Sequence, residues 1–103
     1  MNKLLEQAIA MKDEIISYRR TIHNNPEVGT ELPKTKAYVM DKLREFGYEP
    51  KEICESGIVA TIEGSKPGKT FLLRADMDAL PMAEATGLDF KSNNGSMHSC
   101  GHD

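Results

Sequence analysis

The chain has little of what disulfide-rich or membrane proteins need. Its 103 residues include two cysteines and no tryptophan. Small secreted domains that depend on disulfides have a higher cysteine density, so both cysteines are expected to be free thiols. Charged residues interrupt every apolar run well short of the ~20 residues that a membrane-spanning helix requires. The N-terminal stretch also carries charges throughout, unlike the apolar middle of a signal peptide, and this predicts a cytoplasmic protein.

The chain also lacks a strong excess of charge of either sign. Thirteen Lys and Arg residues face sixteen Asp and Glu residues, which leaves a net charge of −3. Such a balance predicts neither nucleic acid nor an anionic membrane as a partner. The 39% hydrophobic and 28% charged content is ordinary for a globular protein. A chain of this length can form one domain with one modest core.

Two helices are predicted in the first half of the chain. Apolar residues recur at helical spacing over residues 2–23, and Asn24-Asn25-Pro26 ends that pattern. The second helix is predicted over residues 33–46, because Pro33 suits a first helical turn and Gly47 suits a C-terminal stop.

Strand-like segments follow these helices. Short apolar and β-branched runs occupy residues 50–54, 58–63 and 70–75, with turn residues between them. The loop at residues 64–68 has a length suited to a hairpin. The continuous apolar sequence at residues 71–73 predicts a strand that is covered on both faces. Helices followed by strands in this order predict the beginning of an α/β or α+β domain.

Residues with chemical potential gather after the last predicted strand. Cys100 and His102 flank a single glycine, so in an extended segment both side chains fall on one side, as ligands for a transition metal would. Taken alone this spacing is a weak signal, and a structural cysteine beside an exposed histidine is the more frequent explanation. Asp76 and Asp78 follow residues 71–73, where they can orient a metal-bound histidine, hold a cation, or merely begin a turn. Asp103 offers a further carboxylate beside His102.

Two other reactive side chains are predicted to have structural roles. Cys54 stands in an apparent strand without metal-type neighbours, which predicts a packing residue at the core or an edge. His23 stands at a helix end, where a cation is favoured, and a cap or surface role is predicted for it.

Three motifs in order resemble those of one family. Residues 19–29 (RRTIHNNPEVG) resemble its opening pattern R-x-x-[LI]-H-x-x-P-E-x-[GS]. Residues 74–81 (RADMDALP) and 97–103 (MHSCGHD) resemble its next two signatures. The family is that of the metal-dependent aminoacylase-like amidohydrolases, which includes hippurate hydrolases, N-acetyl-diaminopimelate deacetylases and auxin-conjugate hydrolases. Three ordered motifs are far more specific than any one of them.

The resemblance implies a fold, a reaction and a set of roles. The fold would be an α/β metallopeptidase-like catalytic domain with a mixed sheet, of which residues 1–103 form the N-terminal portion, without the inserted domain that commonly mediates dimerisation. Cys100 and His102 would bind metal, Asp78 would position the site, and His98 would not be a ligand. Asp76 stands where related metallopeptidases have a metal-binding histidine.

The implied enzyme would use two divalent ions, among Zn, Mn, Co and Ni, to hydrolyse the amide bond of N-acyl amino acids, and would be a homo-oligomer in some members. In the family the general-base glutamate and the remaining metal ligands follow the C-G-H-D motif. We therefore expect the 103-residue chain to be truncated and inactive by itself. The alternative is a non-catalytic metal-binding or interaction module derived from the same fold.

Overall fold

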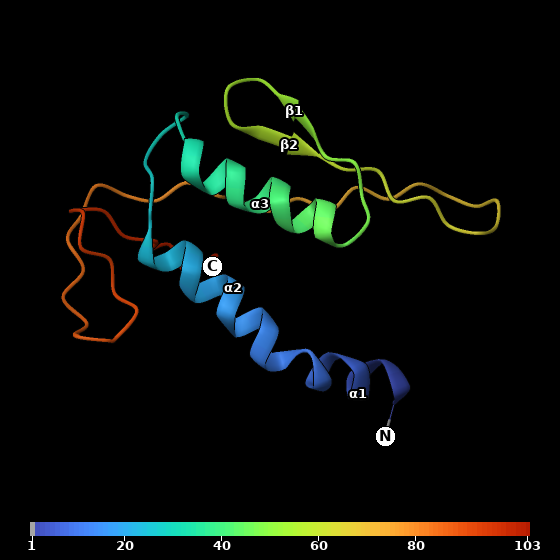
Figure 1. The fold of residues 1–103 in the computed structure, drawn as a ribbon, viewed down its shortest axis with the longest axis horizontal. Helices are drawn as coiled ribbons and strands as arrows, with labels where there is room; N and C mark the ends of the chain where they lie inside the picture. Colours follow the sequence, from blue (N-terminus) through green and yellow to red (C-terminus); the bar gives the residue numbers. More distant parts are fainter. Residues whose placement is uncertain (1) are drawn as a thin grey trace.

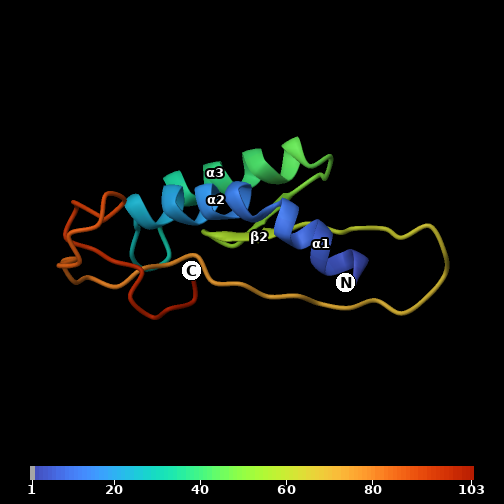
Figure 2. The same ribbon diagram turned by 90° about the horizontal axis from the view of Figure 1, so that it is seen from below.

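The computed structural model describes residues 2–103, in which helices come first, a small sheet follows, and irregular segments complete the chain (Figure 1). The helices are α1 (Lys3–Ala10), α2 (Lys12–Asn24) and α3 (Pro33–Glu45), and the strands are β1 (Lys51–Ile53) and β2 (Gly57–Val59). Figure 2 shows α2 and α3 side by side in one layer, with β2 and a long extended segment to one side of that layer.

The predicted first helix is divided in two at Met11. The N–H of Met11 is shared between the carbonyls of Gln7 and Ala8, at 3.3 and 3.2 Å, which tightens the chain toward 3₁₀ geometry. No residue of α1 is buried, and Leu4 remains 73% exposed. Since no side chain of α1 is buried, tertiary packing does not hold the two helices in one line.

The second predicted helix is confirmed as α3, and both of its ends are capped by residues outside it. The Glu27 carboxylate accepts hydrogen bonds from the backbone N–H groups of Lys34 and Thr35, at 3.2 and 2.5 Å. At the other end Gly47 has φ 91°, and the N–H of Tyr48 reaches the Leu43 carbonyl at 3.0 Å. This is the Schellman arrangement, which satisfies carbonyls that the helix leaves unpaired.

β1 and β2 form an antiparallel hairpin whose turn corrects the prediction for Cys54. Lys51 pairs with Val59 and Ile53 pairs with Gly57, so Cys54 begins the turn rather than lying in the strand. Cys54 is exposed and has φ 56°, a left-handed conformation that costs a residue with a Cβ atom. Glycine is needed at Gly57 because a Cβ there would clash with the Ile53 carbonyl. The hairpin therefore forms one loop earlier than predicted.

The third predicted strand does not form. Phe71, Leu72 and Leu73 are extended but 84%, 92% and 95% exposed, and no backbone hydrogen bond joins residues 70–75 to another part of the described chain. In Figure 1 the chain after β2 runs away from the helices, and residues 70–75 lie on the arm that returns. A strand needs a neighbour for its N–H and C=O groups and a layer over its apolar face. Residues 2–103 supply neither, so the expectation of two covered faces is wrong for this chain.

The hydrophobic core is correspondingly small. Among the described apolar side chains only Leu32, Met40, Ala79 and Pro26 are buried. The Cα radius of gyration is 15.7 Å, whereas a compact chain of this length measures about 13 Å. No helix of residues 2–103 has the length and apolarity to cross a bilayer.

Short backbone bridges place the chemically capable loops beside the end of α2. Ala79 donates its N–H to the Glu27 carbonyl at 2.8 Å, and Leu80 exchanges hydrogen bonds of 2.9 Å with Met97. Val28 and Ala79 form a parallel bridge, and Leu80 and Met97 an antiparallel one. The segments that carry the second and third motifs are thereby fastened to each other and to the loop after α2.

Candidate metal centre

All three of the predicted site residues line one cleft of about 300 Å³. The cleft lies between α2, the segment after residue 75 and the last six residues. Its lining is Arg19, Ile22, Asp76, Asp78, Ala79, Leu80, His98, Ser99, Cys100, His102 and Asp103. Residues more than twenty positions apart in the sequence therefore meet here, as the two motifs required.

The donor groups of this cleft fit a transition metal. His102 Nδ1 lies 3.0 Å from Asp76 Oδ2. A histidine that binds metal through one nitrogen almost always gives the other to a carboxylate or carbonyl, so this contact leaves Nε2 as the available ligand atom. The side chain of His102 is 63% exposed, and Cys100 is exposed as well. Both are therefore accessible to an ion.

Asp76, rather than Asp78, is the aspartate that contacts the predicted ligand. Asp76 is 23% exposed and also pairs with Arg74 at 2.6 Å. Asp78 lines the cleft, but within residues 2–103 no hydrogen bond or ion pair joins it to His102. The carboxylate in direct reach of the histidine is thus the one that stands in place of a histidine in related metallopeptidases.

His98 has a buried nitrogen without a partner. In the part of the chain that the structure describes, nothing hydrogen-bonds to its Nε2. Desolvation lowers the pKa of His98 below its ordinary value, with the cation-disfavouring proximity of His23 adding to it and Asp103 opposing it. The neutral imidazole is therefore favoured at this wall of the cleft.

Residues 2–103 contain no complete set of metal ligands. Among them, no three side chains of His, Cys, Asp or Glu converge as a group that could hold an ion. Cys100 and His102 would thus be two ligands of a larger set. Zinc sites in proteins normally have at least three protein ligands, and the two predicted here are fewer than that.

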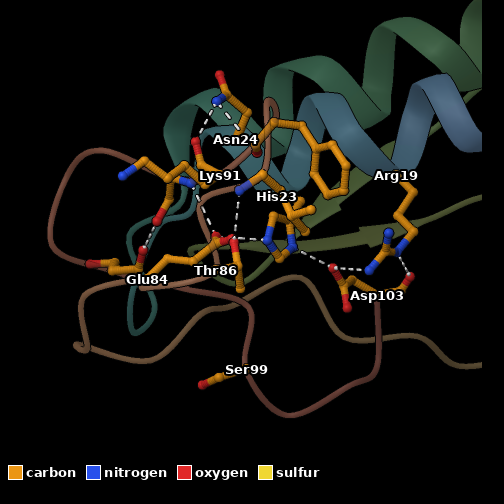
Figure 3. A network of polar contacts seen from close by, with 12 residues as sticks. Arg19, His23, Asn24, Glu84, Thr86, Lys91, Ser99 and Asp103 are labelled. Carbon is orange, nitrogen blue, oxygen red and sulfur yellow. Dashed lines mark hydrogen bonds and ion pairs between the residues drawn. The ribbon is translucent and has the colours of Figure 1, made fainter.

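His23 corrects the prediction of a surface role. It is 4% exposed, and its two ring nitrogens meet carboxylates from two distant segments. Nδ1 lies 2.6 Å from Asp103 Oδ2, and Nε2 lies 2.8 Å from Glu84 Oε1 (Figure 3). Arg19 reaches the same aspartate, with Nε 3.0 Å from the Asp103 carbonyl and Nη2 3.5 Å from its carboxylate.

Glu84 is held by several donors besides His23. Its carboxylate accepts from the hydroxyl of Thr86 and from the N–H of Ser92, the latter at 3.1 Å. The Thr86 hydroxyl foremost, and then the Ser92 N–H and His23, outweigh burial and lower the pKa of Glu84. The side chain has no exposed surface, so this ionised carboxylate ties the loop of residues 84–92 to α2.

The sequence held a signal for this network. Arg19 and His23 are four residues apart, and such residues lie on one face of a helix. Both belong to the first of the three motifs. Two charged residues that share a helix face and a functional motif indicate a buried polar contact. The position of His23 at the helix end, taken alone, had suggested the surface.

The chain is similar in sequence to several known hydrolases. Residues 72–103 match the family described as peptidase family M20/M25/M40. The whole chain is 46% identical to thermostable carboxypeptidase 1 of Saccharolobus solfataricus, of which it covers 27%. It is 45% identical over 90% of its length to the N-acetyldiaminopimelate deacetylase of Listeria innocua, covering 26% of that protein. It is 42% identical over 97% of its length to the hippurate hydrolase of Campylobacter jejuni, covering 27%.

Solved structures agree in fold. A protein of methicillin-resistant Staphylococcus aureus, named an aminohydrolase, matches 99% of the chain with a TM-score of 0.90 and 40% identity. The Bacillus subtilis YXEP protein, named a dinuclear metal-binding peptidase of the M20 family, matches 90% with a TM-score of 0.83 and 35% identity. The chain covers 28% and 27% of these structures and about a quarter of its curated relatives. The expected fold class is confirmed.

Proposed function

We propose that the chain belongs to peptidase family M20/M25/M40 and supplies part of the metal centre of a hydrolase that cleaves the amide bond of N-acyl amino acids. Two of its relatives carry names of that reaction type, N-acetyldiaminopimelate deacetylase and hippurate hydrolase. The choice of substrate class rests on these relatives. The chain spans about a quarter of their length, so the activity is proposed for a protein that contains this chain.

The observation that carries the proposal is the contact between Asp76 and His102 in the cleft that also contains Cys100. Asp76 accepts the Nδ1 hydrogen bond and leaves Nε2 of His102 as the ligand atom. Cys100 offers a soft sulfur ligand, which suits zinc, cobalt or nickel, and manganese is accepted in many sites with carboxylates. Asp78 lines the same wall, and we assign it a positioning role.

Two divalent ions bound there would lower the pKa of a shared water and polarise the amide carbonyl. The residues of this chain hold and orient that centre. His98 lines the same cleft, is favoured as a neutral imidazole, and has a buried Nε2 to which no described residue hydrogen-bonds. The general base implied by the resemblance is a glutamate that follows the C-G-H-D motif. A cytoplasmic location and homo-oligomerisation are parts of the same proposal.

The proposal is tested by assaying the full-length protein that carries this sequence against N-acetyl and N-benzoyl amino acids. Each assay is run after removal of metal by a chelator and after return of zinc, manganese or cobalt, with metal content measured in parallel. Turnover that disappears with the metal and returns with it supports the proposal. Metal-independent turnover, or none with any N-acyl amino acid, contradicts it.

A non-catalytic metal-binding or interaction module is the second candidate. The exposed apolar segment at residues 71–73 favours it for the 103-residue chain, because such a surface attracts a covering partner. Metal binding without turnover in the full-length protein would select this candidate over the first.

A further inference from the structure

His23 links two segments, residues 84–92 and the segment that ends at Asp103, which no backbone hydrogen bond of the described residues joins directly. Its imidazole is 4% exposed, with Asp103 at one nitrogen and Glu84 at the other (Figure 3). Asp103 directly follows His102, whereas Glu84 belongs to the loop of residues 84–92. The two contacts therefore lead to different places: one to the proposed ligand segment and one to a loop that has no proposed ligand.

Besides the contact of His102 with Asp76, the ligand segment is held by the contacts of Asp103 with α2. No backbone hydrogen bond within the described residues fastens residues 100–103, and Gly101 has φ 80°, a conformation that glycine adopts without the steric cost of a side chain. The side chain of Asp103 is 12% exposed, while that of His102 is 63% exposed. Asp103 is thus the residue that attaches the segment to the rest of the molecule, and His102 beside it is exposed and accessible to an ion.

Two side chains on one face of α2 contact Asp103. Arg19 and His23 are one helical turn apart, and both reach Asp103, at 3.0 Å to its carbonyl and 2.6 Å to its carboxylate. The Arg19 side chain is 44% exposed, so solvent screens its share of the interaction. The His23 contact is the shielded one, and a shielded hydrogen bond to a carboxylate is the stronger constraint.

The contact at Glu84 serves the loop instead. Glu84 also accepts from Thr86 and Ser92, so it organises its own loop and needs His23 only to attach that loop to the helix. Loss of this contact would loosen residues 84–92 without freeing Asp103.

We propose that His23 is a positioning residue of the metal centre: through Nδ1 it holds Asp103, and thereby keeps His102 directed into the cleft, while its Nε2 contact with Glu84 is structural. This inference rests on the proposed function, since it presumes that His102 binds metal. It predicts that loss of the Asp103 contact weakens metal binding and that loss of the Glu84 contact does not. If His23 were only structural, the two losses would have the same effect on metal binding.

Two substitutions divide the contacts. The carboxamide nitrogen of asparagine lies near the position of histidine Nδ1, and that of glutamine near Nε2. His23→Asn therefore keeps a donor for Asp103, and His23→Gln keeps a donor for Glu84. Zinc affinity of the full-length protein is measured by competition with a chelating dye, and thermal unfolding is measured beside it. Cys100→Ser is included to test the metal centre itself.

We expect His23→Gln to bind zinc ~10–100-fold more weakly than wild type, as loss of an outer partner typically does, and His23→Asn to stay within a few-fold of wild type. Both should unfold at lower temperature. Equal affinity losses in the two variants, or a larger loss in His23→Asn, would overturn the inference. If Cys100→Ser leaves zinc binding unchanged, the proposed function fails instead.

A second pair of variants applies if either substitution at His23 prevents folding. Asp103→Asn and Glu84→Gln keep the shape of each side chain and remove the charge that faces His23. The inference predicts weaker zinc binding only in Asp103→Asn. A loss of affinity in Glu84→Gln as large as that in Asp103→Asn refutes it.

Discussion

Replacing Asp76 with alanine should weaken metal binding by the full-length protein without a matching loss of stability. The side chains of Asp76 and His102 are 23% and 63% exposed, and their contact is 3.0 Å long. A pair with that exposure contributes about 0–1 kcal/mol to folding. Removing the partner that orients a metal-binding histidine typically costs ~10–100-fold in affinity, or about 1.4–2.8 kcal/mol. The predicted effect on metal binding therefore exceeds the effect on folding.

The assay is competition for zinc between the protein and a chelating dye, with a thermal melt of each variant. Asp41→Ala is the control for loss of a surface aspartate, because Asp41 forms an ion pair with Arg44, at 3.3 Å, on α3, and its side chain is 71% exposed. Asp76→Asn should give an intermediate loss, since its amide oxygen can still accept from Nδ1. Wild-type affinity in Asp76→Ala would refute the reasoning. So would a fall in melting temperature much larger than that of Asp41→Ala.

Three further predictions concern other parts of the molecule. Cys100→Ser and His102→Ala should each abolish metal retention and turnover of the full-length protein, whereas Cys54→Ser, in an exposed turn, should leave both nearly intact; elemental analysis beside activity decides. Folding lowers the pKa of Glu84, so the ionised carboxylate stabilises the fold fully above its ordinary pKa of 4.5, and this stabilisation is lost as the pH falls through the lower pKa of the folded state. The urea midpoint of unfolding should therefore decline below about pH 4.5, and it should decline less steeply in Glu84→Gln. The 103-residue chain alone should show no amidohydrolase turnover and should self-associate through residues 71–73, and Leu72→Lys should reduce the association seen by light scattering; a monomer with a cooperative melt contradicts this.

Local signals in the sequence were sufficient for the elements whose ends they mark. Pro33 and Gly47 bounded α3 to within a residue, because a proline start and a left-handed glycine stop act through the backbone next to them. The Ser56-Gly57 turn was likewise expected from its residues, although the strands beside it are shorter than predicted.

Predictions that depended on distant partners were less successful. Residues 71–73 have the composition of a central strand, but a strand exists only where a neighbour takes its hydrogen bonds, and no segment of residues 2–103 does so. The single helix expected over residues 2–23 divides at Met11, where no glycine or proline marks a break. Helical periodicity predicts which face is apolar, but it does not say whether anything covers that face.

The candidate site shows the same division. Cys100, His102 and Asp78 were selected as a group from the order and residues of three motifs and from the chemistry of thiol, imidazole and carboxylate. The fold places all three around one cleft. Only the tertiary structure decided which carboxylate serves which histidine: Asp76 contacts His102, and Asp103 contacts His23. The physical reason is that residue type and spacing determine what a side chain can bind. Which atom it meets is determined by backbone bridges, such as Leu80 with Met97, between segments that are far apart in the chain.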